Sequence, residues 1–208
     1  MLGNKKIALI LNGEFPKLKK IVTRLVKYDT IITCDGAYAK AINIGIKPHY
    51  TIGDFDSIDE KEIISGQTIL IDDQSENDMR KAINWIAENK GESIDIYGGG
   101  GMRDDHFLAN ILSLLEHTSN IKKRFYTNYG IFSTQTKKMK YESFKGQQIS
   151  IFSSDKSIVI SATGLLYKID NLKCEPGYIL TLNESIGSAF TVKNSHGVIL
   201  VYQAFKSL

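Results

Sequence analysis

The feature that most constrains the fold is a regular alternation of short apolar runs with helical segments across residues 5–127. Each run has the length and residue types of a buried strand. Between the runs, apolar residues recur at helical spacing, as in Met79, Ala82, Ile83 and Ile86. This alternation predicts an α/β fold, a mostly parallel sheet with flanking helices. The runs are Ile7–Leu11, Thr30–Cys34, Tyr50–Ile52, Thr68–Ile71, Ser93–Tyr97 and Lys123–Thr127.

The pattern changes after about residue 130, where strand-like runs follow one another with turn signals and no convincing helix between them. We therefore expect a small all-β sandwich or barrel, with antiparallel strands, after the α/β part. The domains are predicted at residues 1–130 and 131–208, with a hinge near 128–140. The runs are Ile149–Phe152, Ser157–Ile160, Tyr178–Leu182, Ala189–Val192 and Val198–Tyr202.

Bulk composition excludes several classes of protein. Apolar residues make up 42% of the 208 residues and charged residues 24%, as in an ordinary globular protein. The net charge of +3 is spread along the chain, so we expect no nucleic-acid partner. No apolar stretch reaches the length of a membrane span and no signal-peptide core is present at the N-terminus, so we expect no membrane association. Two distant cysteines, Cys34 and Cys174, favour a reduced, cytoplasmic protein.

Acidic side chains gather at the carboxyl ends of the predicted strands, where open α/β sheets bind ligands. Carboxylates that meet there repel one another unless a cation compensates them. Because oxygen ligands suit a hard divalent ion, the pattern predicts Mg²⁺ carrying the phosphates of a nucleotide. The acids are Asp35, Asp54, Asp56, Asp72, Asp73 and Asp78.

Asp54 and Asp56 are the clearest candidates for metal ligands. In an extended segment both would face a cleft, while Phe55 between them would enter the core. A tight turn is the structural alternative, because Asp, Ser and Gly all form turns. The other strand-end acids favour the metal site.

The other acids also have structural interpretations. Asp78 could be a helix N-cap, a role that is compatible with metal binding. Asp35 precedes a glycine, so an Asp-Gly turn is as well supported as a ligand role. One of Asp72 and Asp73 is expected to be a solvated loop charge.

Four glycines, Gly98–Gly101, lead from a predicted strand into a helix. Alone they indicate only a flexible turn, but a helix N-terminus preceded by glycines binds anions, and Arg103 adds a bidentate donor. Asp105 is then expected to pair with Arg103 or to hold metal-bound water. His106 and Asn110 lie one turn apart on one helix face, where we expect orienting or structural roles.

The second domain has a polar strand that could face a ligand. Thr181, Asn183 and Ser185 would point to one face of an extended strand and offer donors and acceptors to a heteroaromatic ring. Residue types alone favour an ordinary polar strand face. The segment Gly164-Leu165-Leu166-Tyr167 is a further candidate.

Together these residues resemble the thiamine pyrophosphokinase family over nearly the whole chain. The resemblance implies an N-terminal α/β nucleotide-binding domain, a C-terminal β-sandwich that binds thiamine, and a homodimer with sites between subunits. It also implies a reaction in which ATP and thiamine give thiamine diphosphate and AMP. The motifs are Cys34-Asp35-Gly36, Gly53-Asp54-Phe55-Asp56-Ser57, Asp73-Gln74 with Asn77-Asp78, Arg103-x-Asp105-His106 with Asn110, Gly164-Leu165-x-Tyr167 and Asn183-Glu184.

The resemblance further implies roles for single residues. Mg²⁺ would be held by Asp54, Asp56 and Asp78. The catalytic set would be Asp54, Asp56, Asp78, Arg103 and Asp105, with Asp54 or Asp105 accepting the proton of the thiamine hydroxyl. The nucleotide would contact Asp35, Gln74, Asn77, Arg103, His106 and Asn110. Thiamine would contact Tyr167, through cation–π attraction, and Thr181 and Asn183.

Four positions depart from the usual family pattern, since Ala37 replaces Gly, Ser75 replaces Asp, Asn77 replaces Thr and Tyr167 replaces Trp. None of these removes a predicted metal carboxylate. Two alternatives stay open, a non-catalytic sensor of thiamine or nucleotide and a Mg²⁺-dependent nucleotide-sugar transferase. Binding of both ligands without AMP release would indicate the sensor, and UDP-sugar binding without ATP binding would indicate the transferase.

Overall fold

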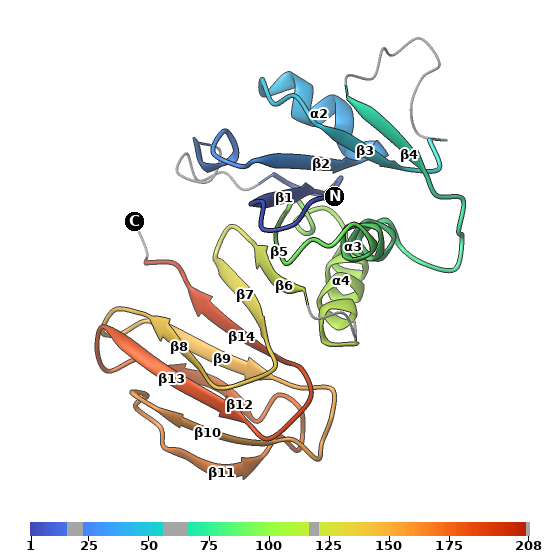
Figure 1. The fold of residues 1–208 in the computed structure, drawn as a ribbon. Helices are drawn as coiled ribbons and strands as arrows, with labels where there is room; N and C mark the ends of the chain where they lie inside the picture. The colour runs from blue at the N-terminus through green and yellow to red at the C-terminus, as the bar shows by residue number, and fades with distance from the viewer. Residues whose placement is uncertain (16–22, 56–65, 117–120, 207–208) are drawn as a thin grey trace. The chain divides into compact units, whose positions relative to one another are not determined.

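The computed structural model describes residues 1–15, 23–55, 66–116 and 121–206, which form two compact units (Figure 1). The first unit takes in the chain up to Asn128 and the second begins at Tyr129, except that Leu114–Glu116 group with the second. Within the described ranges, none of the helices is long and apolar enough to span a membrane.

The sheet of the first unit has parallel strands in the order β6-β5-β1-β2-β3-β4. Every residue of the central strand β1 is buried, as expected of a strand covered on both faces. The strand order reverses between β1 and β5, which creates a switch point at their carboxyl ends. The strands are β1 Ile7–Ile10, β2 Thr30–Cys34, β3 Tyr50–Gly53, β4 Gln67–Leu70, β5 Ser93–Tyr97 and β6 Lys122–Tyr126.

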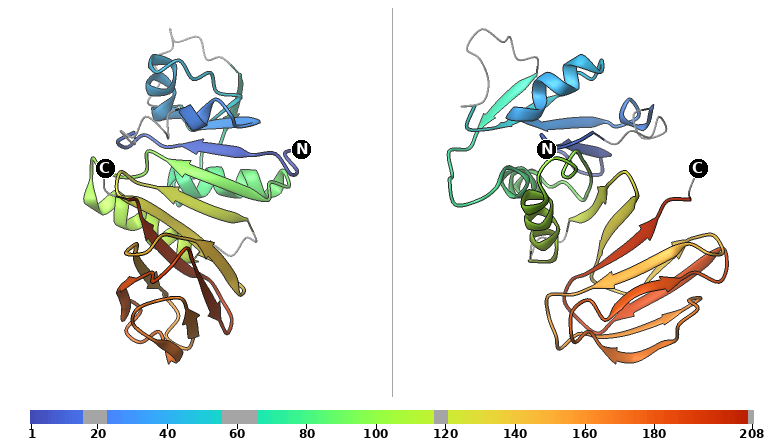
Figure 2. Two further views of the ribbon diagram at one scale, coloured as in Figure 1. Left: turned by 90° about the vertical axis from the view of Figure 1, so that its left-hand side faces the viewer. Right: turned by 180° about the vertical axis from the view of Figure 1, so that it is seen from behind.

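Helices flank this sheet (Figure 1, Figure 2). The short helix η1 (Asp35–Ala37) and α2 (Tyr38–Asn43) follow β2, α3 (Asp78–Glu88) precedes β5, and α4 (Asp104–Glu116) follows it. The apolar stripe of α3 is buried and packs against β2 and β3, as its helical spacing predicts. The predicted α/β architecture is therefore confirmed.

The second unit is a sandwich of two antiparallel sheets, with strand orders β12-β9-β14-β7 and β11-β10-β13-β8. Side chains from both sheets form one core, in which Tyr141 stacks on Phe190 with ring centroids 5.0 Å apart. The predicted all-β part is confirmed as a sandwich. The strands are β7 Gly130–Gln135, β8 Met139–Glu142, β9 Gln148–Phe152, β10 Val159–Thr163, β11 Ile169–Lys173, β12 Leu180–Glu184, β13 Ala189–Asn194 and β14 Ile199–Ala204.

The boundary between the two units falls at Asn128 and Tyr129, within the segment where the hinge is expected, although most of residues 128–140 is sheet. Strand β7 pairs with β14 from Gly130 opposite Ala204 to Gln135 opposite Ile199, and β8 forms the edge of the other sheet. These strands and β11 carry mixed polar and apolar residues, so their strand character depends on partners far away in sequence.

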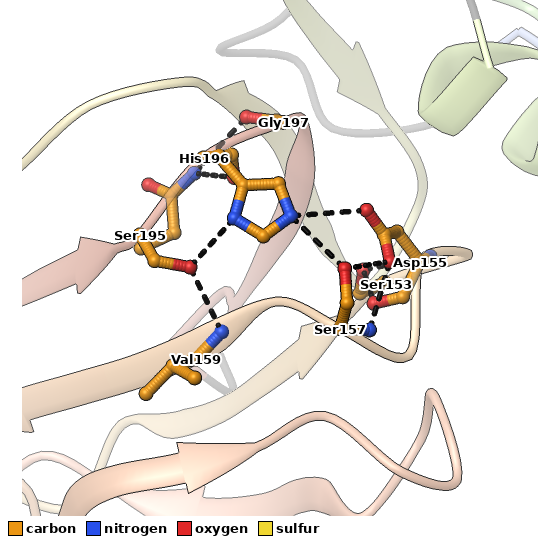
Figure 3. A network of polar contacts seen from close by, with 8 residues as sticks. Ser153, Asp155, Ser157, Val159, Ser195, His196 and Gly197 are labelled. Atoms are coloured by element: carbon orange, nitrogen blue, oxygen red, sulfur yellow. Dashed lines mark hydrogen bonds and ion pairs between the residues drawn. The ribbon is translucent and has the colours of Figure 1, made fainter.

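A polar network joins two turns of the second unit (Figure 3). Nδ1 of His196 lies 2.9 Å from Oγ of Ser195, and its Nε2 lies 3.2 Å from Oδ2 of Asp155 and 3.1 Å from Oγ of Ser157. The Ser195 hydroxyl also accepts a hydrogen bond from the amide of Val159 at 3.0 Å. Although serine, histidine and aspartate meet here, they join neighbouring turns, so we interpret the network as structural.

We expect Asp155→Asn to lower stability near neutral pH and to have less effect in acid. Hydrogen bonds from the Ser157 hydroxyl and amide, and then from His196, hold the pKa of Asp155 below its usual value. Such a carboxyl stabilises the fold above its unfolded pKa of about 3.9, and this contribution is lost as pH falls through the lower folded pKa. Urea midpoints of wild type and variant should therefore differ at about pH 6 and converge below about pH 3.

The control is Asp170→Asn, which removes an exposed carboxylate 3.0 Å from Lys168 in the same unit. It should shift the urea midpoint little at either pH, because exposed ion pairs contribute little. An Asp155→Asn effect of the same size at both pH values would contradict the prediction.

Candidate active site

A cavity of about 280 Å³ opens at the switch point between β1 and β5. It lies at the carboxyl ends of the strands, where open α/β sheets bind ligands. The loops after β1 and β5 and the beginnings of α3 and α4 supply most of its walls. The lining residues are Leu11, Asn12, Gly13, Cys34, Asn77, Asp78, Met79, Gly98, Gly99, Gly100, Met102, Arg103, His106 and Asn110.

Asp35 is buried and binds backbone groups. Its Oδ1 accepts a hydrogen bond from the amide of Gly36 at 2.6 Å, and its Oδ2 accepts one from Phe55 at 3.0 Å. Burial raises the pKa of Asp35, and the two amides oppose that rise. A Cβ on Gly53 would lie 2.5 Å from Cγ of Asp35, so a glycine is needed there. Asp35 therefore connects the turns after β2 and β3, in agreement with its turn interpretation.

Asp54 and Asp78 both face one buried lysine, Lys81. Its Nζ lies 3.8 Å from Oδ2 of Asp54 and 3.7 Å from Oδ1 of Asp78, and only 4% of its side chain is exposed. Gln74 donates a hydrogen bond from Nε2 to the same Asp54 oxygen at 3.1 Å. Two carboxylates thus face a single positive charge, which leaves a net negative charge on this group of side chains.

Asn77, not Asp78, is the N-cap of α3. Its Oδ1 accepts a hydrogen bond from the amide of Arg80 at 2.9 Å, and its Nδ2 donates to Oδ1 of Asn110 at 3.4 Å. Asp78 is the first residue of the helix, and its side chain is 51% exposed. The N-cap interpretation of Asp78 is therefore wrong, and its carboxylate is available to the cavity.

Asp56, the third predicted metal carboxylate, lies outside the described residues. Among the residues that are described, no group of three His, Cys, Asp or Glu side chains is close enough together to hold a metal ion. The described acidic pair is thus Asp54 and Asp78.

The loop after β5 is joined to the loop after β1 by backbone hydrogen bonds. Gly13 donates to the carbonyl of Gly98 at 2.6 Å, and Glu14 donates to the carbonyl of Gly100 at 2.7 Å. Gly98 adopts a φ of +70°, which favours glycine. A Cβ on Gly13 would lie 2.3 Å from the Gly98 oxygen. This close approach of two backbones forms one wall of the cavity.

Arg103 and Asp105 form a bidentate ion pair at the start of α4. Nε of Arg103 lies 3.1 Å from Oδ1 and Nη2 lies 2.6 Å from Oδ2 of Asp105. Hydrogen bonding to Arg103 lowers the pKa of Asp105 to about 2. Of the two alternatives expected for Asp105, the structure shows the pairing with Arg103. His106 and Asn110 line the cavity, and Asn110 donates to the carbonyl of Gly99 at 3.0 Å.

Two lysines near the site were not predicted from the sequence. Lys40 of α2 donates from Nζ to the carbonyl of Asn12 at 2.6 Å and so holds the loop after β1. Nothing in its sequence neighbourhood indicates this contact. The contact of Lys81 could have been predicted, because a residue three positions after Asp78 lies on the same face of the helix.

We expect Lys81→Met to destabilise the protein without divalent ions and to strengthen their binding. Methionine retains much of the side-chain volume but removes the charge that faces Asp54 and Asp78. Removing one partner of a fully buried pair costs about 3–5 kcal/mol, and the partial exposure of both acids reduces this to about 1–2 kcal/mol. Thermal unfolding in EDTA and across a Mg²⁺ titration measures both effects.

Lys122→Met, at an exposed position of β6, is the matched control and should change neither the stability in EDTA nor the Mg²⁺ dependence. Equal Mg²⁺ dependence of Lys81→Met and wild type would show that Lys81 and the ion do not compete for the same carboxylates.

The predicted thiamine contacts lie in the second unit, where Tyr167, Thr181 and Asn183 line a cavity of about 480 Å³. The Oδ1 of Asn183 accepts a hydrogen bond from the amide of Tyr167 at 3.0 Å, and its Nδ2 donates to the Tyr167 carbonyl at 2.8 Å. Asn183 therefore positions Tyr167, a residue that is 62% exposed.

The expected polar face of Thr181, Asn183 and Ser185 is wrong. The register of β12 shifts between Leu180 and Asn183, and Leu182 adopts a φ of +59°. Asn183 and Ser185 are buried, while Leu182 is 78% exposed. An irregularity of this kind breaks the alternation of faces that a regular strand would have.

Two family models match the chain, the thiamin pyrophosphokinase catalytic domain at residues 23–125 and the thiamin pyrophosphokinase substrate-binding domain at residues 130–202. Thiamine pyrophosphokinase of Bacillus subtilis (strain 168) is 27% identical in an alignment 219 residues long. The alignment covers 96% of this chain and 99% of that protein. Thiamin pyrophosphokinase 1 of Caenorhabditis elegans is 26% identical over 166 residues, covering 73% of this chain and 68% of that protein.

Solved structures share the fold. The crystal structure of thiamine pyrophosphokinase from Bacillus subtilis matches with a TM-score of 0.80 at 24% identity, over 97% of this chain and 100% of that one. Thiamin pyrophosphokinase from Candida albicans matches with a TM-score of 0.78 at 19% identity, over 97% and 90% of the two chains. Because the two family models together match most of its length, the chain belongs to the thiamin pyrophosphokinase family.

Proposed function

We propose that this protein transfers the diphosphate of ATP to the hydroxyl group of thiamine, which gives thiamine diphosphate and AMP. The observation that carries the proposal is the convergence of Asp78, the glycine loop and Arg103 on one cavity, with Asp54 facing the same lysine as Asp78. Backbone amides and a guanidinium suit phosphates, and the acidic pair suits a cation that accompanies them.

Asp54 and Asp78 are the described residues that would hold Mg²⁺. Their ligand atoms are carboxylate oxygens, and the net negative charge beside Lys81 fits a hard cation. Gln74, whose amide nitrogen donates to Asp54, is proposed to contact the phosphates. Asp56, in the adjoining segment, is proposed as a further ligand. When bound, the ion would neutralise phosphate oxygens and stabilise the charge that develops during transfer.

The chain itself would mainly position the reactants. In the proposed reaction, the hydroxyl oxygen of thiamine attacks the β-phosphorus of ATP, and the bond from that phosphorus to the oxygen bridging it to the α-phosphorus breaks, so that AMP leaves. Arg103 and the amides of the glycine loop would bind the phosphates. The hydroxyl proton would pass to a carboxylate. Asp105 is a weak base because its pKa is about 2, so we propose Asp54 for this role.

The second unit would bind the thiamine rings. Tyr167 is exposed beside the cavity of about 480 Å³, so its ring can attract the thiazolium cation. Thr181 is proposed to contact the aminopyrimidine, and Asn183 to act by positioning Tyr167.

A homodimer is proposed on separate grounds. Large apolar side chains of the second unit are exposed near the same cavity, a pattern that marks an interaction surface. Tyr167, Ile179 and Leu182 line that cavity, and Tyr178 and Ile186 are further exposed side chains of the unit. Light scattering should give twice the mass of the 23.3 kDa chain.

We also propose a cytoplasmic location. Cys34 and Cys174 are both buried and form no disulfide, which fits a reducing compartment.

The test is the release of AMP and thiamine diphosphate from ATP, Mg²⁺ and thiamine. Both products should form in equal amounts, and only when all three components are present. Binding of thiamine and ATP without AMP release would support a sensor, and binding of UDP-sugar without ATP would support a sugar transferase. Either result would overturn the proposal.

A further inference from the structure

A second cavity in the first unit lies at the amino ends of β1 and β5, away from the candidate active site at their carboxyl ends. Its volume is about 390 Å³. Lys6, Arg24, Lys27, Tyr28, Asp95 and Arg124 are among its lining residues. We call it the basic cavity, because four of these side chains are cations and one is an anion.

Asp95, the one anion named among the lining residues, already forms an ion pair with Arg124. Asp95 is 4% exposed, and its Oδ1 and Oδ2 accept hydrogen bonds from Nε of Arg124 at 2.6 Å and from Nη2 at 2.7 Å. The hydroxyl of Tyr28 donates a hydrogen bond to the same carboxylate. The charge of Asp95 is therefore compensated inside the wall of the cavity.

The other three cations are left facing the cavity. Within the described part of the chain, the side chains of Lys6, Arg24 and Lys27 form no ion pair, and Asp29 accepts a hydrogen bond from the backbone amide of Lys6 at 2.8 Å. Three like charges around one recess repel one another, so an anion bound between them would be stabilised.

A tyrosine cluster supports the wall of the basic cavity. The hydroxyl oxygens of Tyr28 and Tyr97 are 2.7 Å apart, and Tyr97 stacks on Tyr126 with ring centroids 4.7 Å apart. Arg124 lies over the Tyr126 ring at 6.0 Å. These contacts are present without a ligand, so only the exposed side chains of Lys6, Arg24 and Lys27 would need to be ordered on binding.

We propose that the basic cavity binds the phosphate groups of a small phosphorylated molecule. Lys6, Arg24 and Lys27 would supply both the attraction and the hydrogen-bond donors. A recess with cations on its walls suits a compact polyanion, whereas a nucleic acid would need a basic track along the surface. Among the described lining residues Asp95 is the only carboxylate, so the basic cavity needs no metal ion.

The independence from metal separates this site from the candidate active site in an experiment. Inorganic pyrophosphate is titrated calorimetrically into the protein in EDTA, where the acidic pair Asp54 and Asp78 opposes phosphate binding at the active-site cavity. We expect one saturable site in EDTA. The double variant R24A/K27A should bind about a hundredfold more weakly, at about tenfold for each charged contact removed.

Two further variants serve as controls. K137A/K138A removes the same number of charges from exposed positions in the second unit, and R103A removes the proposed phosphate donor of the active site; both should leave binding in EDTA within about twofold. Thermal unfolding checks that each variant is folded.

The proposal is overturned if no saturable binding occurs in EDTA, if R24A/K27A binds as tightly as wild type, or if R103A abolishes the binding. Inorganic phosphate in place of pyrophosphate should bind more weakly, because it offers fewer charges to the three cations. Because this experiment includes neither thiamine nor Mg²⁺, its result is independent of the proposed transfer reaction.

Discussion

Replacing Asp54 by asparagine is expected to lower the turnover of thiamine diphosphate formation by about 10²–10³-fold, the usual effect of removing one electrostatic group from an active site. Asparagine keeps the size of the side chain and can still accept the hydrogen bond that Gln74 donates at 3.1 Å. It removes the negative charge that faces Lys81 and that is proposed to bind Mg²⁺ and accept the hydroxyl proton. Initial rates of AMP release over a range of Mg²⁺ concentrations give the measurement.

Asp104→Asn is the matched control, since it makes the same change at an exposed position of the first turn of α4. Its turnover should stay within about twofold of wild type. If Asp54→Asn keeps full turnover at saturating Mg²⁺, Asp54 is neither a required ligand nor the proton acceptor.

Replacing Gly13 by alanine is expected to destabilise the first unit by about 3–5 kcal/mol and to reduce turnover with it. The new Cβ would lie 2.3 Å from the oxygen of Gly98 and 2.7 Å from that of Gly100, and both are backbone atoms that cannot rotate away. The clash of the new Cβ with these oxygens could be relieved only if the two loops separated. That breaks the two backbone hydrogen bonds between them, at about 1 kcal/mol each, in addition to an overpacking cost of about 1–3 kcal/mol.

Gly187→Ala makes the same chemical change where a Cβ would have nothing within 4 Å, so it should alter stability by no more than about 0.5 kcal/mol. Urea unfolding of both variants gives the comparison. Wild-type stability and turnover of Gly13→Ala would show that the loops can separate freely and that their contact does not shape the cavity.

Much of the fold could be predicted because its signals are local. The runs at Thr30–Cys34 and Ser93–Tyr97 coincide with β2 and β5, and the helical spacing after Asp78 coincides with α3. These segments are buried, so their apolar pattern follows directly from their position in the fold. Strands β7 and β8 have no such pattern, because pairing with distant strands stabilises them.

The amino-acid sequence by itself determined the α/β and all-β halves, the acids that end the strands and the family to which the chain belongs. Only the tertiary structure decided what each polar group contacts. It placed Lys81 between Asp54 and Asp78, made Asn77 the helix cap, and used the amide of Asn183 to hold Tyr167. The physical reason is that periodicity reports burial along one segment, whereas hydrogen bonds and ion pairs depend on where separate segments meet.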